Sequence, residues 1–586
     1  MGRVTDVDSS DGVSSDFSYN DQNSIAGYSV TKNNTVISKA DYTYNDTSGL
    51  LTGVTTDNGT YNSFSYTYDG LNRLSTSSHS VSGSTMNTIY AYSAGTNSDT
   101  TGLVGVIVYI KGSNAFMPPL GYTYDNNGNI ATVSKNSTIH ITYTYDSLNR
   151  LVREDNKDLN KTVTYTYDER GNILNKKTYA YTTGSLTNAT VTDTVTYSYN
   201  STWKDKLVSF DGQSISYDSI GNPTAYRGAS LTWEKGRQLK SYATSSKTLN
   251  FKYNAEGLRT EKKVGSTTYS YTWASGLLMQ QSDGTNTLNF SYSPDGRPLA
   301  VKFNGTNYYY IYNLQGDVIG LYNTSGTVVV QYTYDSWGVL LSTTGSLAST
   351  LGALNPFRYR GYIYDEETEL YWLRSRYYDP ETGRFLNADV FVSTGQGINA
   401  LNMFAYCGNN PVINIDITGT RYVKGIDACG GAGNYKTIQK NEYSYGTTFS
   451  IGGTWGYTKG QHSYSESYVV STAQDTIAIQ NTTSDGLSTG VGASAGIVIT
   501  LTDANNVFDL EGASNSVGVT IVKKNKGIGI EYMEFNPPSN PDVLCRGISF
   551  IIPIGAEIEI HEYNNKTKTR KHWKTPIVKI LENILS

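Results

Sequence analysis

The stretch YTYDSLNRL at residues 143–151 decides the fold, because close copies of it recur along the chain. Residues 66–74 read YTYDGLNRL, and residues 165–173 read YTYDERGNI. Where consecutive copies are best preserved, the second Tyr moves from 124 to 145 to 167 and from 312 to 334, in steps of 21, 22 and 22 residues. Looser copies keep all or part of the phrase at residues 122–125, 217–218, 253–254, 310–313, 332–335 and 362–365.

The residue types of one copy predict a β-hairpin. Tyr-x-Tyr places two rings on one face of a strand, Asp bonds to the backbone N–H groups that follow it, and Asn or Gly accepts the positive φ of a tight turn. A single hairpin cannot bury its apolar face, whereas copies that pair edge to edge form one long sheet. A Tyr-rich β-sandwich is the alternative, but the regular phase and spacing of the copies favour the repeat.

The composition agrees with strands and excludes several classes of protein. Among 586 residues there are 50 Tyr beside 15 Phe and 7 Trp, and the net charge of -5 gives no general reason to bind nucleic acid or an anionic membrane. Cys407, Cys429 and Cys545 lie far apart, which indicates buried thiols rather than a disulfide framework or a metal site. We expect no cofactor and no metal.

No segment resembles a membrane span or a secretory signal. The best apolar run, residues 547–560, is interrupted by Pro553 and Glu557 and falls short of the ~18 residues of a spanning helix. The first residues, MGRVTD, are neither basic before an apolar run nor amphipathic. Since the chain begins in repeat material, the sequence predicts the C-terminal part of a longer protein.

The YTYD-x-x-[GN]-[NR]-[LI] units, over about residues 40–419, resemble the YD repeats of the RHS (rearrangement hotspot) and teneurin-like family. Residues 364–389, YDEETELYWLRSRYYDPETGRFLNAD, resemble the RHS repeat-associated core, and NMFAYCGNNPV at 402–412 continues that pattern. The resemblance implies an all-β spiral of hairpins forming a shell-like wall over residues 1–357, a plug at 358–419, and a separate variable domain at 421–586, commonly a toxin. It also implies a secreted or cell-surface protein and a cognate immunity protein as partner.

The resemblance further implies an intramolecular aspartyl protease made by Arg376, Asp389 and Asp416, which cuts near the Thr420–Arg421 bond. Two neighbouring carboxylates cannot both ionise easily, so one keeps a proton as general acid while the other activates water, and an Arg selects the charged form of one of them.

The sequence departs from the family pattern beside these residues, because Val390 and Ile417 replace Pro and Thr420 replaces Leu. Autoproteolysis and a closed shell that never cleaves both stay open. In the simplest structural interpretation, the two Asp form turns and the Arg pairs with them.

Residues 421–586 are Gly-rich, alternating and lower in Tyr. Residues 489–500 and 516–522 are predicted strands joined through a turn at 503–506, and residues 577–585 have helical spacing, so we expect a β-rich domain with a short terminal helix. The basic run at 566–574 contains Trp573 and suits either nucleic acid or, more simply, a solvated tail.

Catalytic signals in this domain are weak. His462 and Glu466 lie on one strand face and form a candidate acid/base pair, and His572 adds an imidazole without metal-ligand spacing. GGAGNYKT at 430–437 lacks the second Gly of a phosphate-binding loop. Two functions remain. In the first, residues 421–586 are the effector of a polymorphic toxin. In the second, the chain is a non-enzymatic surface or wall-associated protein that uses its Tyr-rich shell for carbohydrate binding or cell contact.

Overall fold

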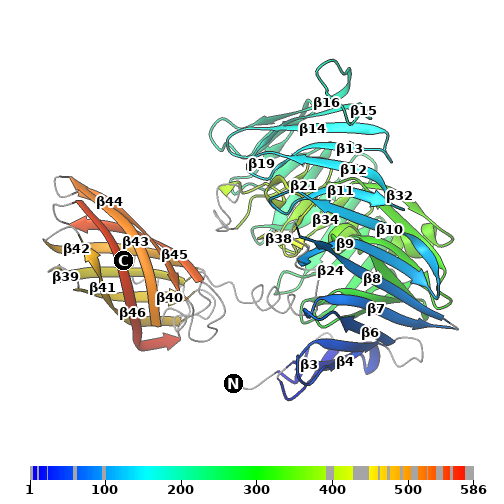
Figure 1. Ribbon diagram of the computed structural model, residues 1–586, viewed down its shortest axis with the longest axis horizontal. Helices are drawn as coiled ribbons and strands as arrows, with labels where there is room; N and C mark the ends of the chain where they lie inside the picture. The colour runs from blue at the N-terminus through cyan, green and yellow to red at the C-terminus, as the bar shows by residue number, and fades with distance from the viewer. Residues whose placement is uncertain are drawn as a thin grey trace. The chain divides into compact units, whose positions relative to one another are not determined.

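The computed structural model shows two compact units, residues Met1–Lys436 and Thr437–Ser586, built almost entirely from strands (Figure 1). The predicted all-β class is therefore confirmed. The domain boundaries predicted at 357–358 and 420–421 divide the chain into repeats, plug and variable domain. They rest on the expected roles of these segments, and they stay predictions. The structure describes residues 4–425 apart from 10–11, 23, 57–62, 83, 96–99 and 391–400, together with eight strands between residues 448 and 574.

The first unit begins with an 18-stranded sheet in which each strand pairs antiparallel with the next one along the chain. Thr, Tyr, Ser and Val are the most frequent residues of these strands, and the aromatic and β-branched ones among them pack well on a pleated surface. The strands are β1 (Asp6–Asp8), β2 (Val13–Tyr19), β3 (Ile25–Lys32), β4 (Thr35–Tyr44), β5 (Leu51–Thr56), β6 (Ser63–Tyr68), β7 (Leu74–Val81), β8 (Ser84–Ala94), β9 (Thr100–Lys111), β10 (Asn114–Tyr124), β11 (Ile130–Lys135), β12 (Thr138–Tyr145), β13 (Leu151–Asn156), β14 (Lys161–Tyr167), β15 (Ile173–Ala180), β16 (Val191–Tyr199), β17 (Leu207–Phe210) and β18 (Gln213–Ser214).

A second sheet of 14 strands continues the same up-and-down order. It ends before a short π-helix, η1 (Ala348–Gly352). Its strands are β19 (Ser216–Tyr217), β20 (Pro223–Tyr226), β21 (Ala229–Glu234), β22 (Gln238–Ala243), β23 (Thr248–Tyr253), β24 (Arg259–Val264), β25 (Thr267–Ala274), β26 (Leu277–Ser282), β27 (Thr287–Tyr292), β28 (Pro298–Phe303), β29 (Thr306–Tyr312), β30 (Val318–Asn323), β31 (Val328–Tyr334) and β32 (Leu340–Thr344).

The turn of each copy forms as its sequence predicts. After β6, the Asp69 Oδ1 atom accepts the backbone N–H groups of Leu71 and Arg73 at 2.9 and 3.0 Å, and the N–H of Asp69 donates to the carbonyl of Arg73. Asn72, between them, has a φ of +60°. The third residue after the leading Asp or Asn also has positive φ at Gly128, Asn149, Gly171, Gly221, Gly257, Gly316, Gly326 and Gly338, whereas after Asp365 it is the fourth, Glu369.

The second Tyr of a copy bonds to the preceding copy through its hydroxyl group. Tyr145 donates to the carbonyl of Ile130 at 2.7 Å, and Tyr167 donates to that of Leu151 at 2.5 Å. We call this series of bonds the tyrosine ladder. Each such bond contributes roughly 1 kcal/mol. The ladder also links Tyr44 to Ile25, Tyr68 to Leu51, Tyr92 to Leu74, Tyr124 to Val104, Tyr199 to Ile173, Tyr253 to Leu239, Tyr292 to Leu278, Tyr312 to Pro298 and Tyr334 to Val318, with the indoles of Trp233 and Trp273 bonding to Pro223 and Arg259 in the same way.

The two sheets face each other along part of their length. Tyr42 in β4 donates its hydroxyl to the carbonyl of Tyr292 at the end of β27 at 2.9 Å, and Tyr109 in β9 donates to the carbonyl of Tyr312 at 2.7 Å. The first Tyr of a phrase is usually buried, as Tyr42 is, while the Thr between the two Tyr is exposed. The first ring therefore faces the interior and the Thr that follows it faces solvent, because side chains alternate along a strand.

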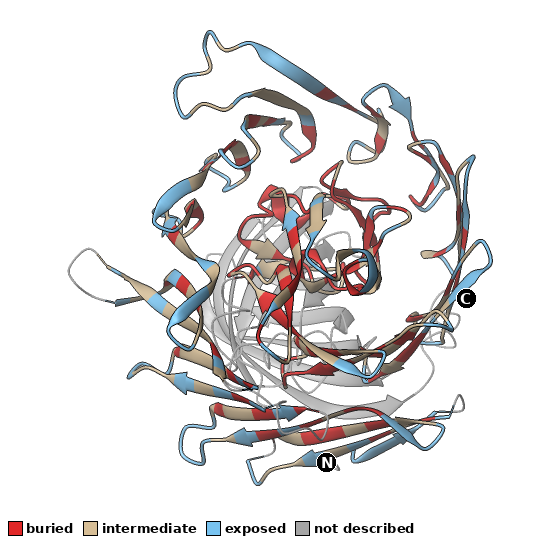
Figure 2. Cartoon of the chain, turned by 90° about the vertical axis from the view of Figure 1, so that its right-hand side faces the viewer, coloured by how far each residue is buried: buried red, intermediate tan, exposed pale blue. Residues whose placement is uncertain are grey.

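Residues 353–390 and 401–425 belong to a core segment that the two sheets surround, and most of these residues are buried (Figure 2). Cys407 is buried in it as a free thiol, as predicted. A four-stranded sheet and a two-stranded sheet make up most of its regular structure. The elements are η2 (Tyr359–Gly361), β33 (Ile363–Asp365), β34 (Leu370–Trp372), β35 (Tyr377–Asp379), β36 (Arg384–Phe385), η4 (Cys407–Asn409), β37 (Asn414–Ile415) and β38 (Val423–Lys424).

Buried ion pairs join the core segment to the surrounding strands. Arg259 of β24 binds both carboxylate oxygens of Asp365 in β33, at 2.6 and 3.0 Å, and Lys262 lies 3.2 Å from the same carboxylate. Burial acts to raise the pKa of Asp365, but the two cations outweigh burial and lower it. Arg227, which is partly exposed, pairs with one carboxylate oxygen of the buried Asp379 at 3.0 Å.

The second unit contains a closed barrel of eight strands, so the β-rich expectation is confirmed for its described part. The expected turn at 503–506, the expected helix at 577–585 and the loop at 430–437 lie outside the described residues. The expected solvated tail is wrong: residues 566–574 end a strand, in keeping with the strand preference of their alternating Thr. In barrel order the strands are β39 (Thr448–Thr458), β40 (His462–Ser471), β41 (Thr476–Ser488), β46 (Ile558–Lys574), β43 (Gly512–Lys523), β44 (Lys526–Phe535), β45 (Cys545–Ile554) and β42 (Gly492–Thr502).

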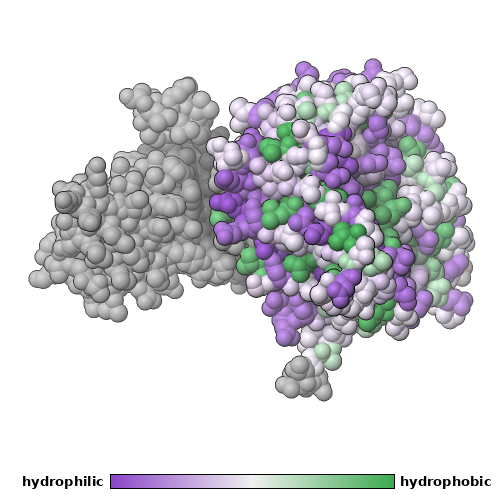
Figure 3. All heavy atoms as spheres, turned by 90° about the horizontal axis from the view of Figure 1, so that it is seen from above, coloured by the Kyte–Doolittle hydropathy of each residue, from purple (hydrophilic) through white to green (hydrophobic). Residues whose placement is uncertain are grey.

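The surface of the first unit is mixed in character. On the face drawn in Figure 3, hydrophilic and hydrophobic residues alternate over short distances. Within the residues that the structure describes, no helix is long and apolar enough to cross a membrane.

Candidate active site

The structure brings together Arg376, Asp389 and Asp416, which lie far apart in sequence. One guanidinium nitrogen of Arg376 lies 2.8 Å from a carboxylate oxygen of Asp389 and 3.4 Å from one of Asp416. All three side chains are buried. Arg376 immediately precedes β35, Asp389 follows β36, and Asp416 immediately follows β37. The ends of three short strands therefore place two carboxylates on one cation.

Asp416 also holds the backbone at the predicted cut. Its Oδ1 atom accepts the N–H groups of Gly419, Thr420 and Arg421 at 2.8, 3.0 and 3.3 Å. The chain can turn back this tightly because Gly419 has a φ of +74°. A Cβ at position 419 would lie 2.9 Å from the carbonyl oxygen of Leu373, so only glycine fits here.

The environment keeps a proton on Asp416 at higher pH than usual. Burial raises its pKa to about 6, the attraction of Arg376 opposes this rise, and the negative charge of Asp389 adds to it. Two carboxylates on one arginine, one of them with a raised pKa, are thus arranged as coupled acid/base chemistry requires.

Ser375 and the carbonyl of Gly419 belong to the site, although sequence reasoning missed them. The Ser375 hydroxyl lies 2.7 Å from the carbonyl oxygen of Thr418 and 2.8 Å from that of Gly419, and Arg376 Nε donates to the Gly419 carbonyl as well. Two donors thus converge on the carbonyl of the Gly419–Thr420 peptide bond. The adjacency of Ser375 to Arg376 was the only signal in the sequence.

Further contacts fix the catalytic candidates in position. The carbonyl of Met403 accepts Arg376 at 3.0 Å and the N–H of Asp389 at 2.9 Å. The hydroxyl of Tyr362 accepts the N–H of Asp416 at 2.7 Å. Nothing in the sequence pointed to Met403 or Tyr362, because the first acts through its backbone and the second is one of many tyrosines.

The effector candidates of the second unit are not all on one face of its barrel. His462 pairs with Asp485 of β41, Glu466 with Asn481, and His572 with Ala478. Positions 485 and 481 lie on the same face of β41, whereas position 478 lies on the opposite face because side chains alternate along a strand. His462 and Glu466 therefore share a face, and His572 does not join them.

The described residues contain no group of three or more His, Cys, Asp or Glu side chains that would hold a metal ion. Two carboxylates, one arginine and one serine are the side chains that meet at the site in the core segment.

A wall of YD hairpins around a core segment with a buried acidic pair defines a class of shell proteins. The teneurin YD-shell family matches residues 281–412. The tRNA nuclease WapA of Bacillus subtilis is 36% identical over 282 residues, which are 47% of this chain and 12% of that protein. Toxin protein Tse5 of Pseudomonas aeruginosa is 42% identical over 64 residues, which are 11% of this chain and 5% of Tse5.

A solved structure shares the fold. The crystal structure of TcdB2-TccC3-TEV superposes with a TM-score of 0.55 at 18% identity, over 70% of this chain and 21% of that one. The chain is an RHS/YD-repeat protein. It spans about an eighth of the length of the WapA relatives that it matches.

Proposed function

We propose that this chain is the C-terminal part of an RHS-type polymorphic toxin, whose YD-repeat shell encapsulates or presents the variable domain at residues 421–586. The similarity to tRNA nuclease WapA and to toxin protein Tse5 supports this role, and so does the shell fold shared with TcdB2-TccC3-TEV. Secretion or display at the cell surface and a cognate immunity protein belong to the same proposal.

We further propose that the chain cuts itself at the end of its core segment. The observation that carries this step is the position of Asp416, which shares Arg376 with Asp389 while bonding to the amides of Thr420 and Arg421. Asp416, with its raised pKa, donates a proton as general acid. Asp389, 2.8 Å from Arg376, activates the attacking water.

The cut is tested on purified full-length protein under denaturing conditions. Two pieces are expected, and Asp389→Asn or Asp416→Asn is expected to leave one uncut chain. Asp295→Asn, which changes a carboxylate between the two sheets, is the matched control and should still yield two pieces. Uncut protein from the unmutated chain contradicts autoproteolysis.

Sequencing the N-terminus of the smaller piece identifies the bond. A piece that begins at Arg421 supports the predicted site. A piece that begins at Thr420 assigns the cut to the carbonyl of Gly419, which Ser375 and Arg376 hold.

The toxin role is tested by expressing residues 421–586 in a bacterial host. Growth arrest is expected, and relief by the product of a small gene immediately downstream would identify the immunity protein. Harmless accumulation of folded protein contradicts the toxin role and favours a non-enzymatic surface protein. Purified piece incubated with tRNA, with DNA and with lipid vesicles then separates the possible targets.

A further inference from the structure

The residues directly after the predicted cut are bound to the core segment by contacts that a cut leaves intact. β38 pairs antiparallel with β37, with Val423 opposite Ile415. The N–H of Gly425 donates to the carbonyl of Ile413 at 2.6 Å. These bonds join residues on the two sides of the Thr420–Arg421 bond through space, independently of that bond.

A slot in the core segment receives Tyr422. Gly408 in η4 has a φ of +60°, and a Cβ there would lie 2.8 Å from the hydroxyl oxygen of Tyr422 and 2.9 Å from its ring carbon Cζ. Tyr422 and Val423 pack against the hydrophobic core. Burial raises the pKa of Tyr422 to about 12, so its hydroxyl stays neutral at any physiological pH. The slot therefore suits a neutral aromatic side chain next to an extended backbone.

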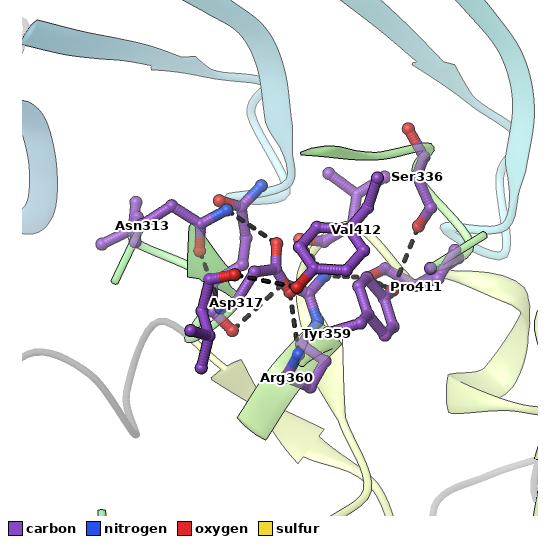
Figure 4. A network of polar contacts seen from close by, with 12 residues as sticks. Asn313, Asp317, Ser336, Tyr359, Arg360, Pro411 and Val412 are labelled. Atoms are coloured by element: carbon purple, nitrogen blue, oxygen red, sulfur yellow. Dashed lines mark hydrogen bonds and ion pairs between the residues drawn. The ribbon is translucent and has the colours of Figure 1, made fainter. Parts of the chain in front are cut away.

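The segment between this slot and β37 is anchored independently of residues 421–425. Arg360 donates to the carbonyls of Pro411 and Val412 while also binding Asp317 at 3.1 Å, and Tyr359 donates to Pro411 at 3.2 Å (Figure 4). These contacts fix the chain that leads into β37 to a turn of the second sheet. The edge of β37 is thus a preformed template for an extended segment.

A cut at the predicted bond would add one more attraction. Hydrolysis consumes one water and leaves a carboxylate on Thr420 and an ammonium group on Arg421. The nitrogen of Arg421 already lies 3.3 Å from Asp416 Oδ1. An α-amino group has a pKa of about 8, so the new N-terminus is mostly charged at neutral pH. Its hydrogen bond to the Asp416 carboxylate then becomes charge-assisted.

We propose that the core segment is a binding site for the new N-terminal segment, Arg-Tyr-Val-Lys-Gly at residues 421–425, and holds the C-terminal unit noncovalently after the cut. This inference rests on the proposed function. Release of the C-terminal unit then takes two events: hydrolysis of one peptide bond, and removal of β38 from β37 with withdrawal of Tyr422 from its slot.

The first test compares denaturing and native separation of full-length protein. Two pieces on a denaturing gel that run as one peak in native size-exclusion chromatography are expected. Tyr422→Ala and Gly408→Ala should speed dissociation of the smaller piece at least tenfold, whereas Tyr181→Ala, in the loop between β15 and β16, should not. Native separation of the unmutated pieces, or unchanged retention in Tyr422→Ala, overturns the binding site; one band on the denaturing gel contradicts autoproteolysis instead.

A second test does not need the natural cut. In full-length Asp389→Asn protein, a recognition sequence for a site-specific protease is inserted either between Thr420 and Arg421 or just after Gly425. Added protease should leave the C-terminal unit bound in the first version and free it in the second. Equal release or equal retention in the two versions overturns the proposal.

Discussion

The wall formed by β1–β32 and the core segment at residues 353–425 are stabilised in different ways. In the wall, the same few hydrogen bonds recur at each copy, as at Tyr145 and Tyr167. In the core segment, buried ion pairs such as Arg259 with Asp365 and Arg376 with Asp389 each use a different local arrangement. A repeated structure spreads its stability over many similar contacts, whereas the core segment concentrates stability and chemistry in a few contacts that cannot replace one another.

The largest expected effect comes from breaking a buried pair of the core segment. Arg259→Met leaves the carboxylate of Asp365 with Lys262 alone in a buried site, so the free energy of unfolding should fall by about 3–5 kcal/mol. Denaturant unfolding of the first unit measures it. The double variant Arg259→Met/Asp365→Leu should recover at least half of the loss. A single variant within about 1 kcal/mol of the parent would contradict the importance of the pair.

The next effect concerns pH and is specific to the core segment. Because the folded pKa of Asp416, about 6, lies above its ordinary value of 3.8, the folded state takes up the proton first as pH falls. Relative to Asp416→Asn, the free energy of unfolding should therefore rise between pH 7 and pH 4, by about 2 kcal/mol. Urea unfolding at several pH values measures this difference, and a difference that stays flat would refute the raised pKa.

A smaller effect is expected where the wall meets the core segment. Gly338 and Gly305 both have positive φ, but a Cβ at 338 would lie 2.6 Å from the ring of Tyr359, while one at 305 meets nothing within 4 Å. Gly305→Ala should cost about 1 kcal/mol from backbone strain alone. Gly338→Ala should cost at least about 2 kcal/mol, because the ring must also move. Thermal unfolding compares the stability of the two variants. Equal losses of stability would show that the turn at Gly338 is not packed tightly against Tyr359 of the core segment.

The smallest effect tests the uniformity of the wall. Tyr145→Phe and Tyr312→Phe each remove one rung of the tyrosine ladder, and each should lower the free energy of unfolding by about 1 kcal/mol. Their effects should add within about 0.5 kcal/mol in the double variant, since Tyr145 and Tyr312 belong to different sheets. Chemical denaturation provides the measurement. Strongly unequal losses would mean that the copies are not equivalent units.

The wall was predictable from sequence because its determinants are local. Asp146 bonds to Leu148 and Arg150, and Asn149 adopts the positive φ between them, all within five residues. The acidic pair of the candidate site was placed only by resemblance to a family.

The remaining contacts were beyond sequence reasoning. Arg259 and Asp365 are 106 residues apart, and no spacing rule connects them. Ser375 and Arg376 reach the Gly419 carbonyl only because the folded backbone brings these distant segments together, and no sequence motif marks that fold. The sequence likewise suggested a free tail at 566–574, because its charges masked the strand preference of its Thr residues.

The order of pairing in the wall has a consequence for how the protein is made. Each strand pairs with the one synthesised just before it, so the wall can assemble while the ribosome is still translating, with little waiting for distant partners. Asp416 emerges after every one of those strands, and Arg376 can meet it only once the core segment is complete. The acidic pair can therefore form only after the ribosome has translated residue 416, and a chain truncated before Asp416 lacks one of its two carboxylates.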